Sequence, residues 1–132
     1  MSISIKSRKA KGRKLQQWCA GWISTITGIP HGKDKDIQSR EMGQSGVDVK
    51  LYGEARELFP FACEAKNSET WSIPAWIKQA KENQADGTHW LLICKKNHHE
   101  EIAILDARTF FRIWQLIIEN GCQNDIKIEG EN

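Results

Sequence analysis

The sequence predicts a single α/β domain, of the α+β kind, in which a small mixed β-sheet is flanked by helices. The chain has 132 residues, 39% of them apolar, which is enough for one hydrophobic core but not for two. Apolar residues recur with a helical period in three segments, and four shorter segments alternate or form apolar runs. The predicted order is helix, strand, strand, helix, strand, strand, helix.

The first predicted helix spans roughly residues 8–27, where apolar side chains recur every three or four positions. Gly28 and the Ile29-Pro30 pair that follows it predict where this helix ends. Residues 31–46 are polar and contain glycine, with neither a helical nor a strand period. We interpret them as a long loop, and loops of this length are usually functional or mobile.

The remaining elements follow from short patterns. Residues 47–51 alternate apolar and polar, and residues 61–66 follow a turn region, so both segments are predicted strands. Ser72 is a candidate cap for a helix that starts near Pro74 and ends near residue 86. Residues 88–94 and 101–105 are predicted strands, and residues 107–120 the last helix. Five tryptophans are predicted to lie in the core: Trp18, Trp22, Trp76, Trp90 and Trp114.

Charge is unevenly distributed along the chain. Six lysines and arginines, without an acid among them, make residues 1–14 a basic arm, and residues 121–132 form an acidic tail. The arm predicts either a polyanionic partner or merely a solvated segment, and composition does not decide between them. The four cysteines lack zinc or redox spacing. Without an apolar run of membrane-spanning length or a secretory signal, we expect a cytoplasmic protein with no membrane partner.

Three charged residues are predicted to share one face of the sheet. Side chains alternate across a strand, so Asp48 lies opposite its apolar neighbours, and Glu64 and Lys66 share the corresponding face of the next strand. If these strands pair, two carboxylates and a lysine converge. Mg²⁺ relieves the repulsion between such carboxylates, and a neighbouring lysine can orient a nucleophile or stabilise developing charge. This set suits phosphodiester hydrolysis.

With these residues in place, the sequence resembles the PD-(D/E)xK nuclease superfamily. Its signature corresponds to Asp48 followed by Glu64-Ala65-Lys66, and the order of elements over residues 8–106 is similar to the restriction-endonuclease-like core of that superfamily. Four segments together resemble small phage-type endonucleases and Holliday-junction resolvase-like members: residues 40–49 (REMGQSGVDV), 59–61 (FPF), 64–67 (EAKN) and 76–80 (WIKQA).

The resemblance implies roles for individual residues. Asp48, Glu64 and the backbone carbonyl of Ala65 would bind Mg²⁺, for which Mn²⁺ could substitute, and Lys66 would position or activate the attacking water. Gln79 matches a glutamine that several branches of the superfamily place beside the site. The chain lacks the glutamate that many resolvase-like members carry on the first helix, so either Gln17 or its neighbour Gln16 takes a water-mediated role, or Glu41 supplies the missing acid.

The implied activity is metal-dependent cleavage of DNA. We expect structure-selective cleavage, as by a Holliday-junction resolvase in phage recombination or replication within the cytoplasm of a host bacterium, and symmetric cleavage of a junction implies a homodimer. A nickase, a flap or single-strand nuclease of the same superfamily, or a non-catalytic DNA-binding accessory protein, are the alternatives. The expected DNA contacts are Lys9, Lys11, Arg13, Lys14, Arg40, Asn67 and, by stacking on a base, Trp71.

Overall fold

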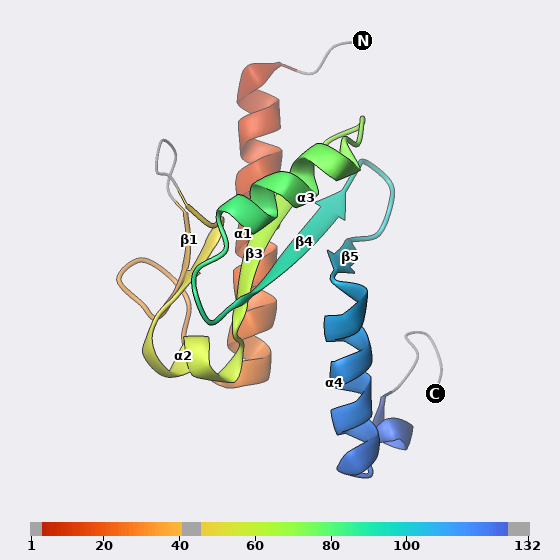
Figure 1. Ribbon diagram of the computed structural model, residues 1–132. Helices are drawn as coiled ribbons and strands as arrows, with labels where there is room; N and C mark the ends of the chain where they lie inside the picture. Colours follow the sequence, from red (N-terminus) through yellow and green to blue (C-terminus); the bar gives the residue numbers. More distant parts are fainter. Residues whose placement is uncertain (1–3, 41–45, 127–132) are drawn as a thin grey trace.

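The protein folds around a five-stranded mixed β-sheet with helices on both faces (Figure 1). The structure is a computed structural model, and it describes residues 4–40 and 46–126. Its elements are α1 (Ile5–Thr27), β1 (Ile37–Ser39), β2 (Val49–Leu51), α2 (Gly53–Leu58), β3 (Phe61–Asn67), α3 (Ile73–Glu82), β4 (His89–Lys95), β5 (Ile102–Leu105), α4 (Ala107–Glu119) and the short 3₁₀ helix η1 (Gln123–Asp125). The predicted class, α/β with helices packed on a small mixed sheet, is confirmed.

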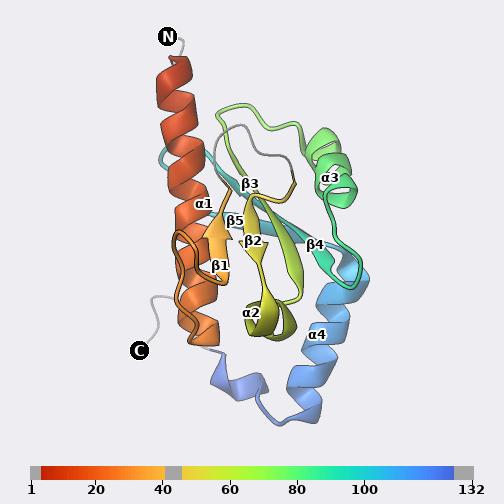
Figure 2. The same cartoon turned by 90° about the vertical axis from the view of Figure 1, so that its left-hand side faces the viewer.

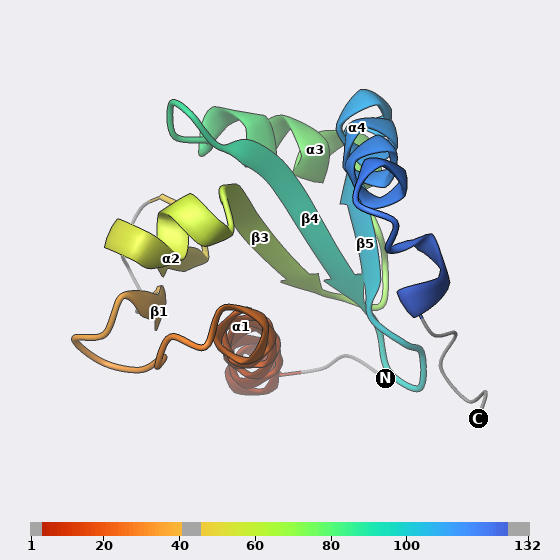
Figure 3. The ribbon, with the colours of Figure 1, turned by 90° about the horizontal axis from the view of Figure 1, so that it is seen from below.

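The strands lie in the order β1-β2-β3-β4-β5. Only β3 and β4 are parallel, and α3 connects them across one face of the sheet, whereas the other neighbouring pairs are antiparallel. Helix α1 packs against β1, β2 and β3 on the opposite face (Figure 3). The strand β3 is therefore enclosed between α1 and α3, so its side chains meet one helix on each face of the sheet.

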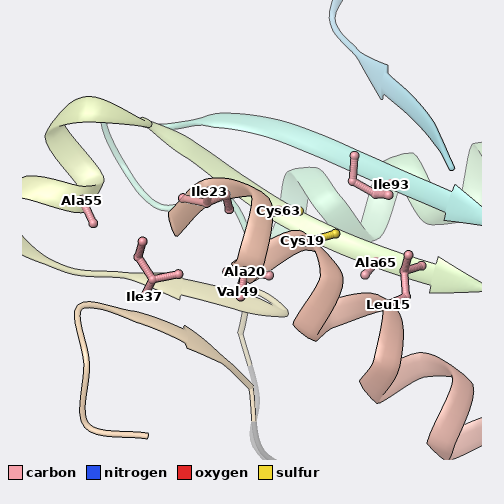
Figure 4. Close-up of a cluster of buried hydrophobic side chains, with 10 residues drawn as sticks. All are labelled: Leu15, Cys19, Ala20, Ile23, Ile37, Val49, Ala55, Cys63, Ala65 and Ile93. Atoms are coloured by element: carbon pink, nitrogen blue, oxygen red, sulfur yellow. The ribbon is translucent and has the colours of Figure 1, made fainter. Parts of the chain in front are cut away.

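The main core lies between α1 and the sheet (Figure 4). Side chains one turn apart on α1 meet the inward-facing residues of four strands, as the alternation of strand side chains requires. The helix contributes Leu15, Cys19, Ala20 and Ile23, and the strands contribute Ile37, Val49, Cys63, Ala65 and Ile93. Cys63 and Ala65 face α1, so the residue between them, Glu64, faces α3.

Two elements were missed by the sequence analysis. The segment 31–46, expected to be a loop, contains β1, a three-residue edge strand whose register pairs Ile37 with Leu51. Three residues are too few to show a period, although Ile37 is completely buried. The expected turn after β2 contains α2, which lies where the chain passes from β2 to β3 (Figure 2) and buries only Ala55.

Helix α1 begins earlier than expected. It starts at Ile5 rather than near residue 8, because the Ser4 side chain accepts a hydrogen bond from the backbone N–H of Ser7 and caps the first turn. Most of the basic segment 1–14 is therefore helical, so its charged residues occupy defined positions on a helix. Ser72 occupies the predicted N-cap position of α3, although its side chain accepts no capping bond from the described residues.

The prediction that all five helix and strand tryptophans belong to the core is wrong for two of them. Trp18 and Trp22 are 40% and 55% exposed on the flank of α1, where their rings contact each other edge to face. Ala20, a smaller side chain, is buried against the sheet instead. Trp76, Trp90 and Trp114 are partly buried.

Candidate active site

The pairing of β2 with β3 brings two acidic residues together. Val49 pairs with Cys63, and the backbone N–H of Asp48 donates to the carbonyl of Cys63 at 3.2 Å. The next position along this antiparallel register sets Asp48 beside Glu64, on the face covered by α3. Asp48 is 2% exposed and Glu64 1%, so two carboxylates occupy the interior at one end of β2. The predicted convergence of these residues is observed, but under a helix rather than on an open face.

The Asp48 carboxylate is held by two groups. One oxygen, Oδ2, accepts a hydrogen bond of 2.8 Å from the backbone N–H of Ala65. The other, Oδ1, lies 2.9 Å from Nη2 of Arg40. The N–H and C=O groups of one strand residue point to the same side of the strand. The Ala65 carbonyl therefore also points toward the β2 side, where Asp48 lies.

The carboxyl group of Glu64 binds its proton more tightly than an ordinary carboxyl group does. Burial, the negative charge of Asp48 and a hydrogen bond between the two carboxyls together raise the pKa of Glu64 to about 7. A hydrogen bond of 2.8 Å from Nδ2 of Asn83 to Oε1 of Glu64 and the charge of Lys66 oppose this rise. Near neutral pH the pair therefore holds a proton that a cation can replace.

Helix α3 supplies the side chains that hold the β3 residues in place. Gln79 Oε1 accepts a hydrogen bond of 2.7 Å from Nζ of Lys66, and Asn83, one helical turn later, donates to Glu64. Positions 64 and 66 lie on one face of β3, and position 83, the C-cap of α3, follows position 79 by about one helical turn. The sequence pattern predicted Gln79 as a site residue but not Asn83. Asn83 could have been found because it follows Gln79 by four residues, a spacing that places two side chains on the same side of a helix.

The donor set fits a hard divalent cation. Within residues 4–40 and 46–126, no group of three or more histidine, cysteine, aspartate or glutamate side chains is assembled as a metal site. Mg²⁺ needs fewer protein ligands, because it keeps several waters and commonly takes one or two carboxylates. Asp48 and Glu64 supply two buried carboxylates whose mutual repulsion shows in the raised pKa of Glu64, and the Ala65 carbonyl points to the same side.

The other predicted site residues are distributed around this centre. Gln17 and Arg13 line a cavity together with Arg40, and Lys9 and Lys14 are exposed on α1. Glu41 lies outside the described residues, so its expected role stays a prediction. The structure brings Arg40 to Asp48, whereas it places Gln17 in the neighbouring cavity.

Three further predicted DNA contacts have partners within the protein. Lys11 Nζ lies 3.8 Å from Glu69 Oε2. Asn67 donates from Nδ2 to the carbonyl of Lys11 at 3.4 Å, which ties the end of β3 to α1. The indole N–H of Trp71 donates to the carbonyl of Ser68 at 2.9 Å. These contacts fix the loop after β3 and place its side chains beside the end of the site strand.

No family model matches the chain, and no curated protein sequence matches it either. Across the described residues, none of the helices combines the length and apolarity needed to cross a membrane.

Proposed function

We propose that this protein is a metal-dependent DNA endonuclease that hydrolyses phosphodiester bonds at a site formed by Asp48, Glu64 and Lys66. The observation that carries the proposal is the buried pair of Asp48 and Glu64, with Lys66 on the same strand face held by Gln79. Burying two adjacent carboxylates destabilises a fold unless they are paired or bind a cation. Arg40 and Asn83 compensate the pair in part, and a divalent cation bound between the two carboxylates would compensate it further.

The arrangement of elements also supports the proposal. Helix α1, the antiparallel strands β2 and β3, and α3 leading into the parallel strand β4 resemble the core arrangement of PD-(D/E)xK nucleases. Asp48 beside Glu64 on paired strands, and Lys66 on the same face of β3 as Glu64, support this likeness. A fold-level likeness leaves the reaction open, so the proposal depends on the site.

Each residue has a role that its contacts allow. Asp48, Glu64 and the Ala65 carbonyl would hold Mg²⁺ or Mn²⁺. Bound there, the ion supplies a water of lowered pKa and positive charge against the phosphodiester. Lys66, held in place by Gln79, orients the attacking water or stabilises developing charge. Asn83 fixes the orientation of the Glu64 carboxylate.

The substrate we propose is branched DNA, as in phage recombination or replication in a bacterial cytoplasm. Cleavage of both strands of a junction needs two sites and therefore a homodimer. Helix α4 is the candidate contact: none of its thirteen residues, all of which the structure describes, is buried, and it extends past the end of the sheet (Figure 1). Phe111, Leu116 and Ile118 are among its exposed side chains. Dimeric sedimentation of the wild type and monomeric sedimentation of Leu116→Ser would support this contact, and a monomeric wild type would contradict it.

The second candidate is a non-catalytic DNA-binding accessory protein. The observation that favours it is the ion pair between Arg40 and Asp48, because this guanidinium already neutralises a carboxylate that a metal-dependent enzyme needs for its cation. The two candidates differ in one expected result: in the presence of divalent ions a nuclease cleaves the bound DNA, whereas an accessory protein leaves it intact.

A cleavage panel tests the proposal. Labelled four-way junction, flap, linear duplex and single strand are incubated with wild type or Asp48→Asn, in Mg²⁺, Mn²⁺ or chelator. Paired nicks on the junction that chelator and Asp48→Asn abolish would support a resolvase. Equal cutting of all substrates would keep the nuclease and discard junction selectivity. Tight binding without any cutting would favour the accessory protein.

A further inference from the structure

A basic cavity lies beside the candidate active site. Its volume is ≈ 610 Å³, and it is formed by α1, the segment that follows α1, and β1. A cavity of this size can accommodate a nucleotide-sized ligand. The polar side chains that line it include Arg13, Gln17, Lys33, Gln38, Ser39 and Arg40.

The charge of this cavity favours an anion. Among the lining residues that the structure describes, Arg13, Lys33 and Arg40 carry positive charge and Asp34 is the one acid, while Arg40 also pairs with Asp48. A concave surface on which one sign of charge predominates attracts ligands of the opposite sign. Arginine forks suit the oxygens of a phosphate in particular.

Arg40 connects the cavity to the carboxylates. It lines the cavity, and its Nη2 lies 2.9 Å from Oδ1 of Asp48 while its Nη1 lies 3.4 Å from the carbonyl of Gly46. One side chain thus reaches both the anion-attracting cavity and the acidic pair.

We propose that this cavity binds a backbone phosphate of the nucleic-acid strand that enters the active site. Arg13 and Lys33 contact the phosphate, and Arg40 lies between the bound phosphate and Asp48. Phosphate contacts of this kind position a strand without reading its sequence. The choice of nucleic acid as ligand rests on the proposed function, whereas a free nucleotide offers the same chemistry from another source.

Equilibrium binding in chelator tests the cavity without any cleavage. The affinity of a fluorescent single-stranded oligonucleotide is measured as a function of salt for wild type and for the double variant Arg13→Ala, Lys33→Ala. Each lost phosphate contact lowers the slope of log K against log salt by about 0.7 on single strands. We expect a slope smaller by about 1.4 and an affinity at least tenfold weaker at low salt.

The control removes the same charge elsewhere. Arg108→Ala, Arg112→Ala takes two arginines from α4, both exposed and on a different helix from the cavity. Equal losses in the two double variants would overturn the proposal, because the effect would then be one of net charge. If the double variant at the cavity fails to fold, Lys33→Glu at an exposed position gives the same comparison against Arg112→Glu.

Competition separates the two sources of phosphate. Inorganic phosphate and a nucleoside monophosphate are titrated against the bound oligonucleotide. The proposal of a subsite for the strand is supported if a millimolar competitor does not displace the oligonucleotide and the double variant binds the oligonucleotide more weakly than the wild type. Binding of the monophosphate alone, dependent on Arg13 and Lys33 and without oligonucleotide affinity, would overturn it. If the double variant cleaves DNA and binds the oligonucleotide as the wild type does, only the cavity proposal is refuted. If the wild type binds the oligonucleotide through the cavity but cleaves no DNA, only the nuclease proposal is refuted.

Discussion

Asp48 and Glu64 lie side by side on paired strands, and the negative charge of Asp48 helps to raise the pKa of Glu64 to about 7. The two residues therefore act as a unit, and the net charge around them depends on whether a proton, an arginine or a metal ion is bound to the carboxylates. Arg40 compensates part of this charge at Asp48, and Asn83 does so at Glu64 through a hydrogen bond.

Stability should depend on pH through Glu64. Its pKa rises from 4.5 in the unfolded chain to about 7 in the folded protein, so between these values the folded state binds more protons. The free energy of unfolding therefore falls as pH rises through this window, by about 3 kcal/mol. Chemical denaturation in chelator between pH 4.5 and 8 measures this fall. Glu64→Gln should remove it, and parallel curves for the two proteins would contradict the assignment.

Divalent ions should stabilise the protein through the same pair. Mn²⁺ at about 100 times its Kd adds about 2.7 kcal/mol to a protein that binds it only when folded. For a domain of this size the melting temperature should rise by roughly 10 °C, more at pH 8 than at pH 6, because the ion competes with the proton on Glu64. Differential scanning calorimetry of wild type and Asp48→Asn, with the exposed Glu54→Gln as control, checks this. An equal rise in all three proteins would place the ion elsewhere.

Gln79 should affect cleavage through Lys66. Removing the hydrogen bond acceptor in Gln79→Ala frees the ammonium group, and loss of such a supporting contact typically costs about 10- to 100-fold. Gln79→Glu keeps an acceptor and should recover much of the rate. Single-turnover cleavage at saturating DNA measures this effect, with the exposed neighbour Lys78→Ala as the matched control. An unchanged rate for Gln79→Ala would show that Lys66 needs no such support.

Two isoleucines of α1 should differ in their contribution to stability. Ile23 is 4% exposed and packs in the core, whereas Ile26, on the same helix, is 59% exposed. Replacement of Ile23 by alanine should cost about 2–5 kcal/mol. The same replacement at Ile26 should change the free energy of unfolding by less than about 1 kcal/mol. Urea denaturation distinguishes them, and equal losses would contradict the packing of α1.

The clustering of the candidate site residues could be predicted from the sequence, because side chains two residues apart on a strand lie on the same face of the sheet. The pattern around Asp48 and the Glu64-Ala65-Lys66 triplet was sufficient to place three charged side chains on one face. Pairing of the two strands and the cover provided by α3 depend on tertiary packing, which local patterns do not encode. Asn83 and the ion pair of Arg40 with Asp48 were missed for this reason.

The errors in the fold have equally local causes. Trp18 fits the apolar spacing of α1, but the positions that contact the sheet are taken by Leu15, Cys19, Ala20 and Ile23, so Trp18 remains 40% exposed. Strand β1 is short enough that its pairing with β2, rather than its own pattern, determines its conformation.

The most direct test of the central claim is single-turnover cleavage of a labelled four-way junction by wild type and Glu64→Gln in Mn²⁺, with Glu54→Gln as control. The proposed site predicts cleavage by wild type and by the control, and a loss of at least about 100-fold in Glu64→Gln. Cleavage by Glu64→Gln at the wild-type rate would show that the buried carboxylate pair is not the catalytic centre.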